Sequence, residues 1–377
     1  MVDRVILDSR ALFVYYDNRG RYLLNELRNR IKVLDDLNFG ISRKDPIMWM
    51  NLFSSMLENH TFGRRRLWTA LARRPSFRRH QSLRVEKHIQ ALRPKPDLVI
   101  QWLGLFASYL ETPLTPYVLI TDNYPDPPGS AVQKNKLRDW TIPKYQQSFY
   151  EFEKELFVNA RYVFTFSRWC RDGIVREYEI DASKVIAVGW GPGMLVPTPG
   201  YFEKLPRSIL AVGNDFRAKG FDVLLNCAEL LPNFKVTIVG KDRFSKHVHI
   251  PTNVTVLGHV SLDTLRELYS KSELLFLFSE FEPDGHVLWE AQAHGCAVVG
   301  YDAYGISEAV AGNETGILLK TRDPMSIAKA IKGLYEDDKV RVMGRTAVDH
   351  YLRNGTWGNV ASKILLHLMT STDSQRT

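Results

Sequence analysis

The sequence is poor in cysteine and contains no long apolar run. Its 377 residues include three cysteines, and Cys170, Cys227 and Cys296 are too isolated for a disulfide framework or a metal-binding pair. The most apolar stretch, residues 98–110, is shorter than the roughly 20 residues that cross a bilayer. The first ten residues place charges among their apolar positions, unlike a secretory signal. These absences predict a reduced, cytoplasmic protein.

Several sequence signatures of catalysis are absent as well. The chain has no H-E-x-x-H, no G-x-S-x-G and no two aspartates at i, i+2. Zinc hydrolysis, the hydrolase nucleophile elbow and a nucleotide held through a metal ion therefore lose support. We expect no metal ion and no cofactor.

Positive charge is concentrated in one segment. The net charge is +8, and residues 61–95 hold nine arginines and two lysines against one glutamate. This segment contains Arg64, Arg65, Arg66, Arg73, Arg74, Arg78 and Arg79. A cluster of this kind attracts an anionic membrane surface, a phosphorylated acceptor or nucleic acid, whereas the simpler interpretation is a solvated helix face. Aromatic residues are sparse there and no nucleic-acid module is visible, so nucleic acid is not an expected partner.

Short apolar runs alternate with helical stretches along the whole chain, which is typical of parallel βαβ units. The expected strands are 5–7, 97–100, 117–121, 162–166, 184–188, 208–212, 235–239, 254–257, 274–278 and 297–300. In the first half, helices are expected over 21–34, 47–57 and 83–92, and Ser167 is expected to cap another. In the second half they are expected over 221–231, 265–269, 287–294, 324–335, 340–352 and 359–369.

A segment rich in proline and glycine, 189–206, separates the two series of runs. The sequence thus predicts an α/β chain of two Rossmann-like, doubly wound domains that face a central cleft. We expect the first domain over 1–190, a linker over 191–206 and the second domain over 207–356. A last helix at about 357–371 is expected to pack back on the first domain.

Two segments that follow expected strands carry charged residues suited to a ligand. The loop Gly213–Gly220 contains Arg217 and Lys219, and its position at a helix start suits a diphosphate. The alternative is a surface turn with solvated cations. The segment after strand 274–278 places Glu282 in a turn and Glu290, eight residues later, about one turn into the following helix, with Gly285 between them. Carboxylates there suit sugar hydroxyls or an incipient cation, and ordinary helix capping is the alternative.

In the first half, Asp122 directly follows strand 117–121. The carboxyl end of a parallel strand is where ligands bind in such sheets, so Asp122 is placed to reach the cleft. An aspartate followed by an asparagine also commonly opens a turn.

From about residue 209 to 352 the chain resembles the nucleotide-sugar domain of retaining GT-B glycosyltransferases, most closely glycosyltransferase family 4. The resemblance rests on AVGNDFRAKGFDVLL, KVTIVG and the run from LGHVSLD to NETGILL, in which Glu282 and Glu290 match the family's E-x7-E. In the first half, DNRGRYLLNEL is similar to the family's turn into its first helix.

The resemblance implies roles for these residues. Lys219, with Arg217 as a substitute for an arginine that the family carries earlier in the loop, would grip the donor diphosphate. Glu282 would lie beside the transferred sugar and Glu290 would bind the ribose. The other implied donor-binding residues are Gly20, Gly258, His259, Val260, Gly285, His286 and Val287. Many relatives carry a histidine where this chain has Asp122, so Asp122 is the candidate for that catalytic role.

The implied activity is that of a retaining hexosyltransferase. It would move a sugar from a nucleotide-diphosphate sugar to an acceptor hydroxyl without a metal ion. The acceptor would be anionic, lipid-linked or a growing glycan, and the Arg-rich segment would dock on the cytoplasmic membrane face. The alternative is a basic protein that binds nucleic acid or membrane on a catalytically inactive GT-B scaffold.

Overall fold

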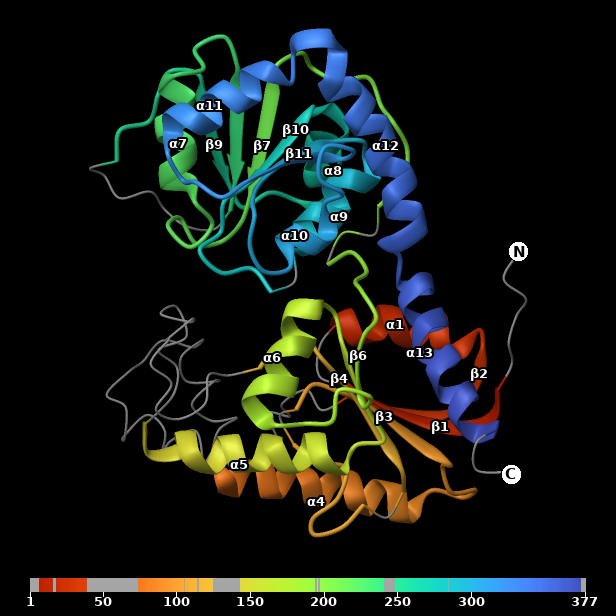
Figure 1. Ribbon diagram of the computed structural model, residues 1–377. Coiled ribbons are helices and arrows are strands. Elements are labelled where there is room, and N and C mark those ends of the chain that lie inside the picture. Colours follow the sequence, from red (N-terminus) through yellow and green to blue (C-terminus); the bar gives the residue numbers. More distant parts are fainter. Residues whose placement is uncertain are drawn as a thin grey trace. The chain divides into compact units, whose positions relative to one another are not determined.

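The computed structural model describes residues 7–15, 18–38, 74–104, 106–113, 115–124, 143–193, 195, 197–240, 248–283 and 285–373. The chain divides into two compact units (Figure 1). The first combines Met1–Val188 with Ala361–Thr377, and the second is the continuous stretch Gly189–Val360.

The first unit contains a six-stranded parallel sheet with the strand order β2-β1-β3-β4-β5-β6. Its strands are β1 (Leu7–Tyr15), β2 (Ile31–Asn38), β3 (Leu98–Trp102), β4 (Tyr117–Thr121), β5 (Tyr162–Thr165) and β6 (Val185–Ala187). Its helices are α1 (Asn18–Arg28), α4 (Pro75–Ala91), α5 (Pro143–Asn159) and α6 (Arg168–Tyr178). Ser167 caps α6 as predicted, because its hydroxyl accepts the Cys170 amide.

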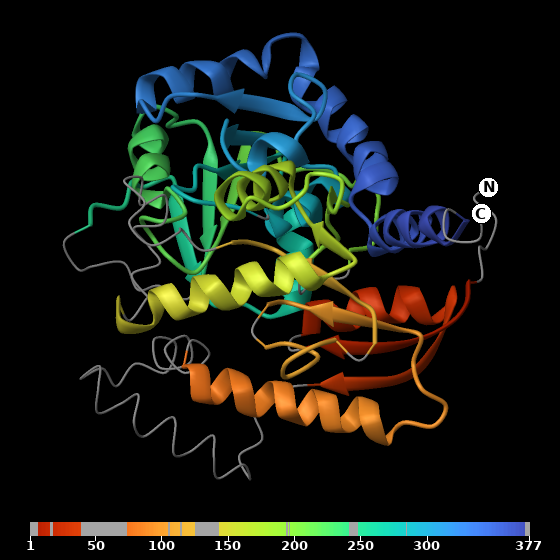
Figure 2. The ribbon, with the colours of Figure 1, turned by 60° about the horizontal axis from the view of Figure 1, so that its bottom comes forward.

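Helices cover both faces of this sheet. Successive side chains of a strand point to opposite faces, and consecutive residues of these strands are buried. Leu12 and Val14 of β1 belong to a buried cluster with residues of α4, α5 and α6. The apolar stripe of α1 (Leu23, Leu24 and Leu27) is fully buried as well. The long helices α4 and α5 lie side by side (Figures 1 and 2).

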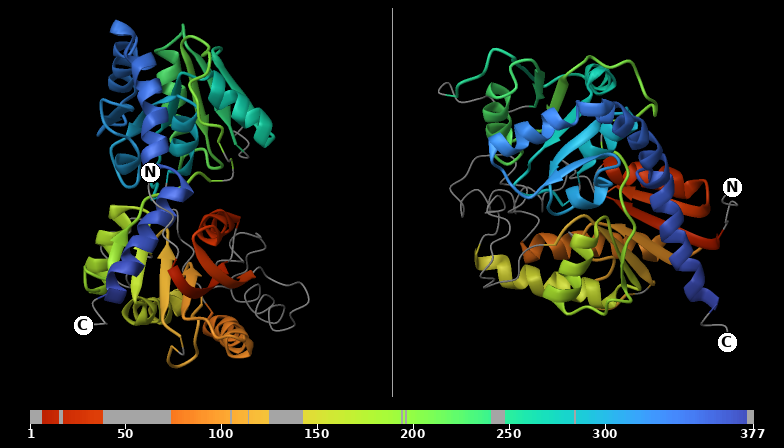
Figure 3. Two further views of the ribbon diagram at one scale, coloured as in Figure 1. Left: turned by 90° about the vertical axis from the view of Figure 1, so that its right-hand side faces the viewer. Right: turned by 45° about the horizontal axis from the view of Figure 1, so that its top comes forward.

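The last helix, α13 (Trp357–Asp373), begins in the second unit, and from Ala361 onward its residues group with the first. It follows α12 (Lys339–Asn354) after a break at Gly355, and the two helices are the darkest blue elements of Figure 3. His367 of α13 makes an edge contact with Phe164 of β5 at 6.3 Å between ring centroids.

The second unit contains another parallel six-stranded sheet, in the order β12-β11-β10-β7-β8-β9. Its strands are β7 (Ser208–Val212), β8 (Lys235–Val239), β9 (Val254–Gly258), β10 (Leu274–Leu277), β11 (Ala297–Tyr301) and β12 (Gly316–Leu319). Besides α12 its helices are α7 (Phe221–Glu229), α8 (Leu262–Lys271), α9 (His286–Ala293), α10 (Ile306–Ala309) and α11 (Pro324–Gly333).

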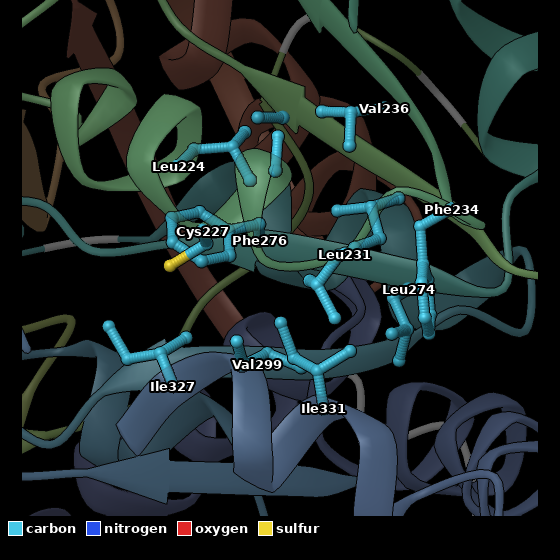
Figure 4. Close-up of a cluster of buried hydrophobic side chains, with 14 of the residues drawn as sticks. Leu224, Cys227, Leu231, Phe234, Val236, Leu274, Phe276, Val299, Ile327 and Ile331 are labelled. Carbon is cyan, nitrogen blue, oxygen red and sulfur yellow. The ribbon is translucent and has the colours of Figure 1, made fainter. Parts of the chain in front are cut away.

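A continuous apolar core lies between this sheet and the helices α7 and α11. Figure 4 shows Leu224 and Cys227 of α7 and Ile327 and Ile331 of α11 packed around Phe276 of β10. These side chains are at most 1% exposed, so each contributes roughly 1.5–3 kcal/mol of burial. The core fixes the sheet from which the functional loops emerge.

The sequence predicts most of these elements but errs at the N-terminus and in the linker. The described part of the first strand is 7–15, which extends well beyond the predicted 5–7, and residues 5 and 6 lie outside the described residues. The expected helix over 21–34 ends at Arg28, because Ile31–Asn38 pairs with β1 as a parallel strand. The helix expected at 47–57 lies outside the described residues. The sequence analysis also missed α5, α10 and β12.

The segment expected as a linker, 191–206, groups with the second unit instead. The Gly200 amide donates to the Ala293 carbonyl at 2.9 Å, and the Leu205 amide donates to the Lys271 carbonyl at 2.8 Å. Buried backbone groups need such partners, so proline and glycine here mark an irregular segment packed on the unit. Among the helices in the described ranges, none is both long and apolar enough to cross a bilayer.

Candidate active site

The order of strands in the second unit marks where a ligand binds. From β7 the chain adds β8 and β9 on one side and then returns to add β10, β11 and β12 on the other. In doubly wound sheets the crevice at the carboxyl ends of the strands where this reversal occurs is the usual ligand site. The loops after β7 and β10, which carry Lys219 and Glu282, therefore meet at that reversal.

The loop after β7 is a tight turn bound to the segment after β10. Within the turn the Asp215 carboxylate accepts the Ala218 amide at 3.0 Å. The Ala218 carbonyl accepts the Glu280 amide at 2.9 Å. Lys219 is partly buried beneath this turn, whereas Arg217 is exposed to solvent. Lys219 and Arg217, both predicted to bind the diphosphate, thus differ in their exposure to solvent.

Glu282 is a buried, ionised carboxylate. It forms an ion pair with Lys219, accepts the Ser279 hydroxyl at 3.1 Å and accepts the Gly285 amide at 3.2 Å. Burial by itself would raise its pKa, but the Lys219 ammonium and the hydrogen bond from the Gly285 amide outweigh burial and hold the pKa of Glu282 below its usual range. The structure therefore brings the predicted Lys219 and Glu282 into direct contact.

Helix α9 begins immediately after this carboxylate. Its N-cap is Gly285, whose φ of +62° is in the left-handed region that favours glycine. The first amides of a helix have no partner within it, so those of His286 and Val287 are at a helix end that favours anions. That this turn binds an anion stays a prediction.

Glu290 lies further along α9 and is 5% exposed. Its carboxylate accepts the amides of Gly193 at 3.1 Å and Leu195 at 3.4 Å. It also accepts the Tyr269 hydroxyl at 3.1 Å. Glu290, which is predicted to bind the ribose, thus holds the backbone of Gly193 and Leu195, which the sequence did not predict. Its contact with the ribose stays a prediction.

His286 contacts the same segment. Its Nδ1 donates a hydrogen bond to the Gly191 carbonyl at 3.3 Å. Its ring contacts the ring of Trp190 edge-on, with 4.6 Å between the ring centroids. Trp357 donates to the Pro192 carbonyl at 3.0 Å. Trp190, Gly191, Gly193 and Leu195 are therefore held by α9, which also carries three of the predicted donor-binding residues, and Pro192 is held by α13.

The loops after β7, β8 and β9 are hydrogen-bonded to one another. The Gly213 amide donates to the Val239 carbonyl and the Gly240 amide donates to the Gly258 carbonyl, both at 2.9 Å. Gly258 ends β9, and His259 and Val260 follow it. The predicted base-binding residues therefore lie on the same carboxyl edge as Lys219.

Gly20 and Asp122 lie in the first unit. Gly20 is buried in the first turn of α1, rather than in a loop before the helix. Asp122 is half-buried directly after β4, as expected. In this sheet the chain order reverses between β1 and β3, so α1 begins beside that reversal.

Two of the predicted patch arginines are structural. Arg74 and Arg78 are 7% and 4% exposed. The Arg78 guanidinium donates to the Ser148 carbonyl at 3.0 Å and lies over the rings of Phe149 and Phe152. Neither side chain is therefore exposed as a solvated helix face or an acceptor or membrane patch would require, because Arg78 joins α4 to α5 and Arg74 lies over the Tyr145 ring of α5. Arg79 is exposed, and Arg64, Arg65, Arg66 and Arg73 lie outside the described residues.

Truncation of Arg78 to alanine is expected to destabilise the protein by about 2–3 kcal/mol. The change removes a charged hydrogen bond and the contacts of the guanidinium with two rings. Arg79→Ala, one residue further along α4, is the matched control and should stay within about 0.5 kcal/mol of wild type. Urea unfolding of both variants measures the difference, and equal midpoints would contradict the structural role.

Three contributors to the site were not predicted. Ser279 directly follows the strand region 274–278, so attention to the first residue beyond a strand could have found it. Tyr269 and the amides of residues 193 and 195 carry no signal in the sequence, because backbone donors are independent of residue type. Within the described ranges no group of three or more His, Cys, Asp or Glu side chains could hold a metal ion.

Comparison with known proteins shows that part of the chain is similar to sugar-transferring enzymes. Residues 202–348 match the family model described as Glycosyl transferases group 1. A D-inositol 3-phosphate glycosyltransferase from Corynebacterium efficiens is 28% identical over 221 residues, covering 51% of this chain and 52% of the relative. An N-acetyl-alpha-D-glucosaminyl L-malate synthase from Bacillus anthracis is 37% identical over 103 residues, covering 27% of this chain and 26% of the relative.

These matches are partial in length, whereas the structural likeness extends over the whole chain. The chain spans about half of the first relative and a quarter of the second. The structure of Anabaena HepE in complex with UDP-glucose superimposes with a TM-score of 0.63 at 16% identity, covering 96% of this chain and 100% of HepE. Within its second unit the chain is therefore similar to the glycosyl transferases group 1 family, and it has the two-domain α/β fold of GT-B glycosyltransferases.

Proposed function

We propose that this protein transfers a sugar from a nucleotide-diphosphate sugar to a hydroxyl of its acceptor, with retention of configuration and without a metal ion. The observation that carries the proposal is the Lys219–Glu282 ion pair at the β7/β10 reversal. Lys219, the proposed cation for the leaving diphosphate, contacts Glu282, the proposed carboxylate for the sugar. Both lie within residues 202–348, which match the family model.

The proposed chemistry follows from these charges. Departure of the nucleoside diphosphate places negative charge on the leaving oxygen, and Lys219 with the first amides of α9 would stabilise it. The sugar gains positive character as the bond breaks, and the ionised Glu282 would stabilise that charge. Arg217, exposed in the same loop, is proposed as a second cation for the diphosphate. Asp122 is proposed to act near the reacting sugar.

We propose a uridine nucleotide as the first donor to test. The structural neighbour HepE was solved with UDP and with UDP-glucose. Gly258, His259 and Val260 are proposed to hold the base, and Glu290 the ribose. Because Glu290 already accepts three protein donors, its ribose contact would require segment 193–195 to shift or to share the carboxylate.

We propose a small anionic acceptor. Inositol 3-phosphate and malate, in the names of two relatives, are both anions that carry hydroxyl groups. The excess of positive charge in residues 61–95 agrees with such a partner. Docking of that segment on an anionic membrane is a second use of the same charge. An inactive scaffold that binds nucleic acid is less favoured, because Lys219, Glu282 and Glu290 are all present and residues 61–95 contain few aromatic side chains.

Calorimetric titration with UDP, GDP, ADP and their sugar conjugates tests the proposal. One nucleoside diphosphate should bind, and Lys219→Ala should weaken it by about 10- to 100-fold, which corresponds to a charged hydrogen bond of 1.5–3 kcal/mol. The matched control is Lys271→Ala, which removes a lysine paired with Glu267 on the surface of α8 and should bind like wild type.

Turnover of the bound donor with inositol 3-phosphate or malate completes this test. Transfer should continue in EDTA, and the new glycosidic bond should have the configuration of the donor. Failure of every nucleotide to bind would refute the proposed function, and rescue of EDTA-treated enzyme by Mg²⁺ or Mn²⁺ would refute metal independence.

A further inference from the structure

Tyr304, in the loop after β11, has a backbone conformation that tyrosine rarely adopts. Its φ of +56° is in the left-handed region, where a Cβ atom crowds the following carbonyl. Residues held in this region cluster at functional sites, where the surrounding structure maintains them. Strands β10 and β11 are neighbours, so this loop emerges beside the one that carries Glu282.

The backbone of this turn has a clear structural purpose that glycine would fulfil equally well. The Gly305 amide donates to the Glu282 carbonyl at 3.0 Å, and the Ala303 amide donates to the Tyr301 carbonyl at 2.8 Å. The turn thus ties the β11 loop to Glu282. Because glycine adopts a positive φ without this strain, the backbone alone does not explain a tyrosine at this position.

The side chain makes a specific contact beside the candidate site. The rings of Tyr304 and Phe281 meet at 68° with their centroids 5.1 Å apart. Both residues are half-buried, and Phe281 directly precedes Glu282. An aromatic pair that stays partly exposed therefore lies next to a buried carboxylate and the start of α9.

We infer that Phe281 and Tyr304 form a platform against which the transferred sugar of the donor packs, and that Tyr304 sets the preference among sugars. This inference rests on the proposed function. A pyranose presents C–H groups on its faces and hydroxyl groups around its rim. The electron-rich face of an aromatic ring attracts the former, and a neighbouring carboxylate accepts hydrogen bonds from the latter.

Tyr304→Gly tests the inference, with Asn313→Gly as the matched control. Asn313 also has a positive φ, +65°, in the same unit. Dissociation constants are measured for the bound nucleoside diphosphate and for its glucose, galactose and N-acetylglucosamine conjugates, together with Tm. For Tyr304→Gly we expect an unchanged or raised Tm, unchanged affinity for the diphosphate and about a three- to tenfold loss of affinity for the preferred conjugate. Asn313→Gly should change neither affinity.

Other outcomes overturn the inference in distinguishable ways. A lowered Tm with the ratio of conjugate to diphosphate affinity unchanged would make the ring contact purely structural. An equal loss for the diphosphate and its conjugates would place Tyr304 on the nucleotide. If Tyr304→Gly does not fold, the ratio of conjugate to diphosphate affinity is measured for Phe281→Leu instead. Wild-type protein that binds no nucleotide would refute the proposed function and the platform with it, whereas wild-type binding with an unchanged ratio in the variant refutes the platform alone.

Discussion

Replacement of Glu282 by glutamine is expected to lower kcat for sugar transfer by about 10²-fold or more. Glutamine retains the size of the side chain but removes the charge that would stabilise the sugar as the donor bond breaks. The exposed Glu280, two residues earlier, provides the matched control as Glu280→Gln. Steady-state rates with the donor identified by calorimetry measure both. Equal rates for the two variants would contradict the role of Glu282.

The same variant predicts a change in how stability depends on pH. The pKa of Glu282 in the folded protein lies below its usual range, which is about 4.3 for an unperturbed glutamate. A depressed carboxyl pKa stabilises the fold above the unfolded value, and this contribution is lost as pH falls through the folded value. Between pH 6 and pH 3, Tm should therefore fall more steeply for wild type than for Glu282→Gln.

Gly240→Ala is expected to destabilise the protein by about 3 kcal/mol. A Cβ at this position would lie 1.6 Å from the Gly213 carbonyl oxygen. The clash is with backbone between neighbouring strands, which cannot move aside as the end of a side chain does. Gly213 also opens the loop that carries Lys219, so the folded fraction of the variant should bind nucleoside diphosphate more weakly.

Gly333→Ala is the control for this effect of added volume. Gly333 ends α11, and a Cβ there would have no atom within 4 Å. Its replacement should leave stability unchanged or raise it by about 0.5–1 kcal/mol. Urea midpoints for the two alanine variants measure the contrast. Equal midpoints for the two variants would contradict the prediction, because they would mean that the loops at Gly213 and Gly240 move apart at little cost in free energy.

The sequence was most informative where one physical signal dominates. Buried parallel strands such as 117–121 and 235–239 read as short apolar runs between polar loops, and their predicted bounds match the structure. The loops that carry Lys219 and Glu282 could both be predicted as functional, because each loop follows such a strand. Their ion pair could not, since β7 and β10 are distant in sequence and adjacent only through the sheet order.

The errors arose where tertiary contacts override local pattern. Residues 31–34 continue the apolar period of the preceding helix, yet they form a strand because β1 offers them a ladder of hydrogen bonds. The charge of Arg78 indicated exposure to solvent, but a guanidinium can be buried against aromatic rings when a carbonyl accepts a hydrogen bond from it. The hydrogen bonds of Glu290 with Gly193 and Leu195 come from backbone amides, which every residue except proline has, so no sequence pattern indicates them.

The discontinuity of the first unit has a consequence for how the protein is made. Ala361–Thr377 belongs to that unit although the whole of Gly189–Val360 precedes it in synthesis. At a synthesis rate of about 5–20 residues per second, roughly 10–30 s pass between these two parts of the unit. Until then Phe164 of β5 lacks its contact with His367 of α13. The second unit is therefore synthesised in full before the last part of the first, although the first begins earlier.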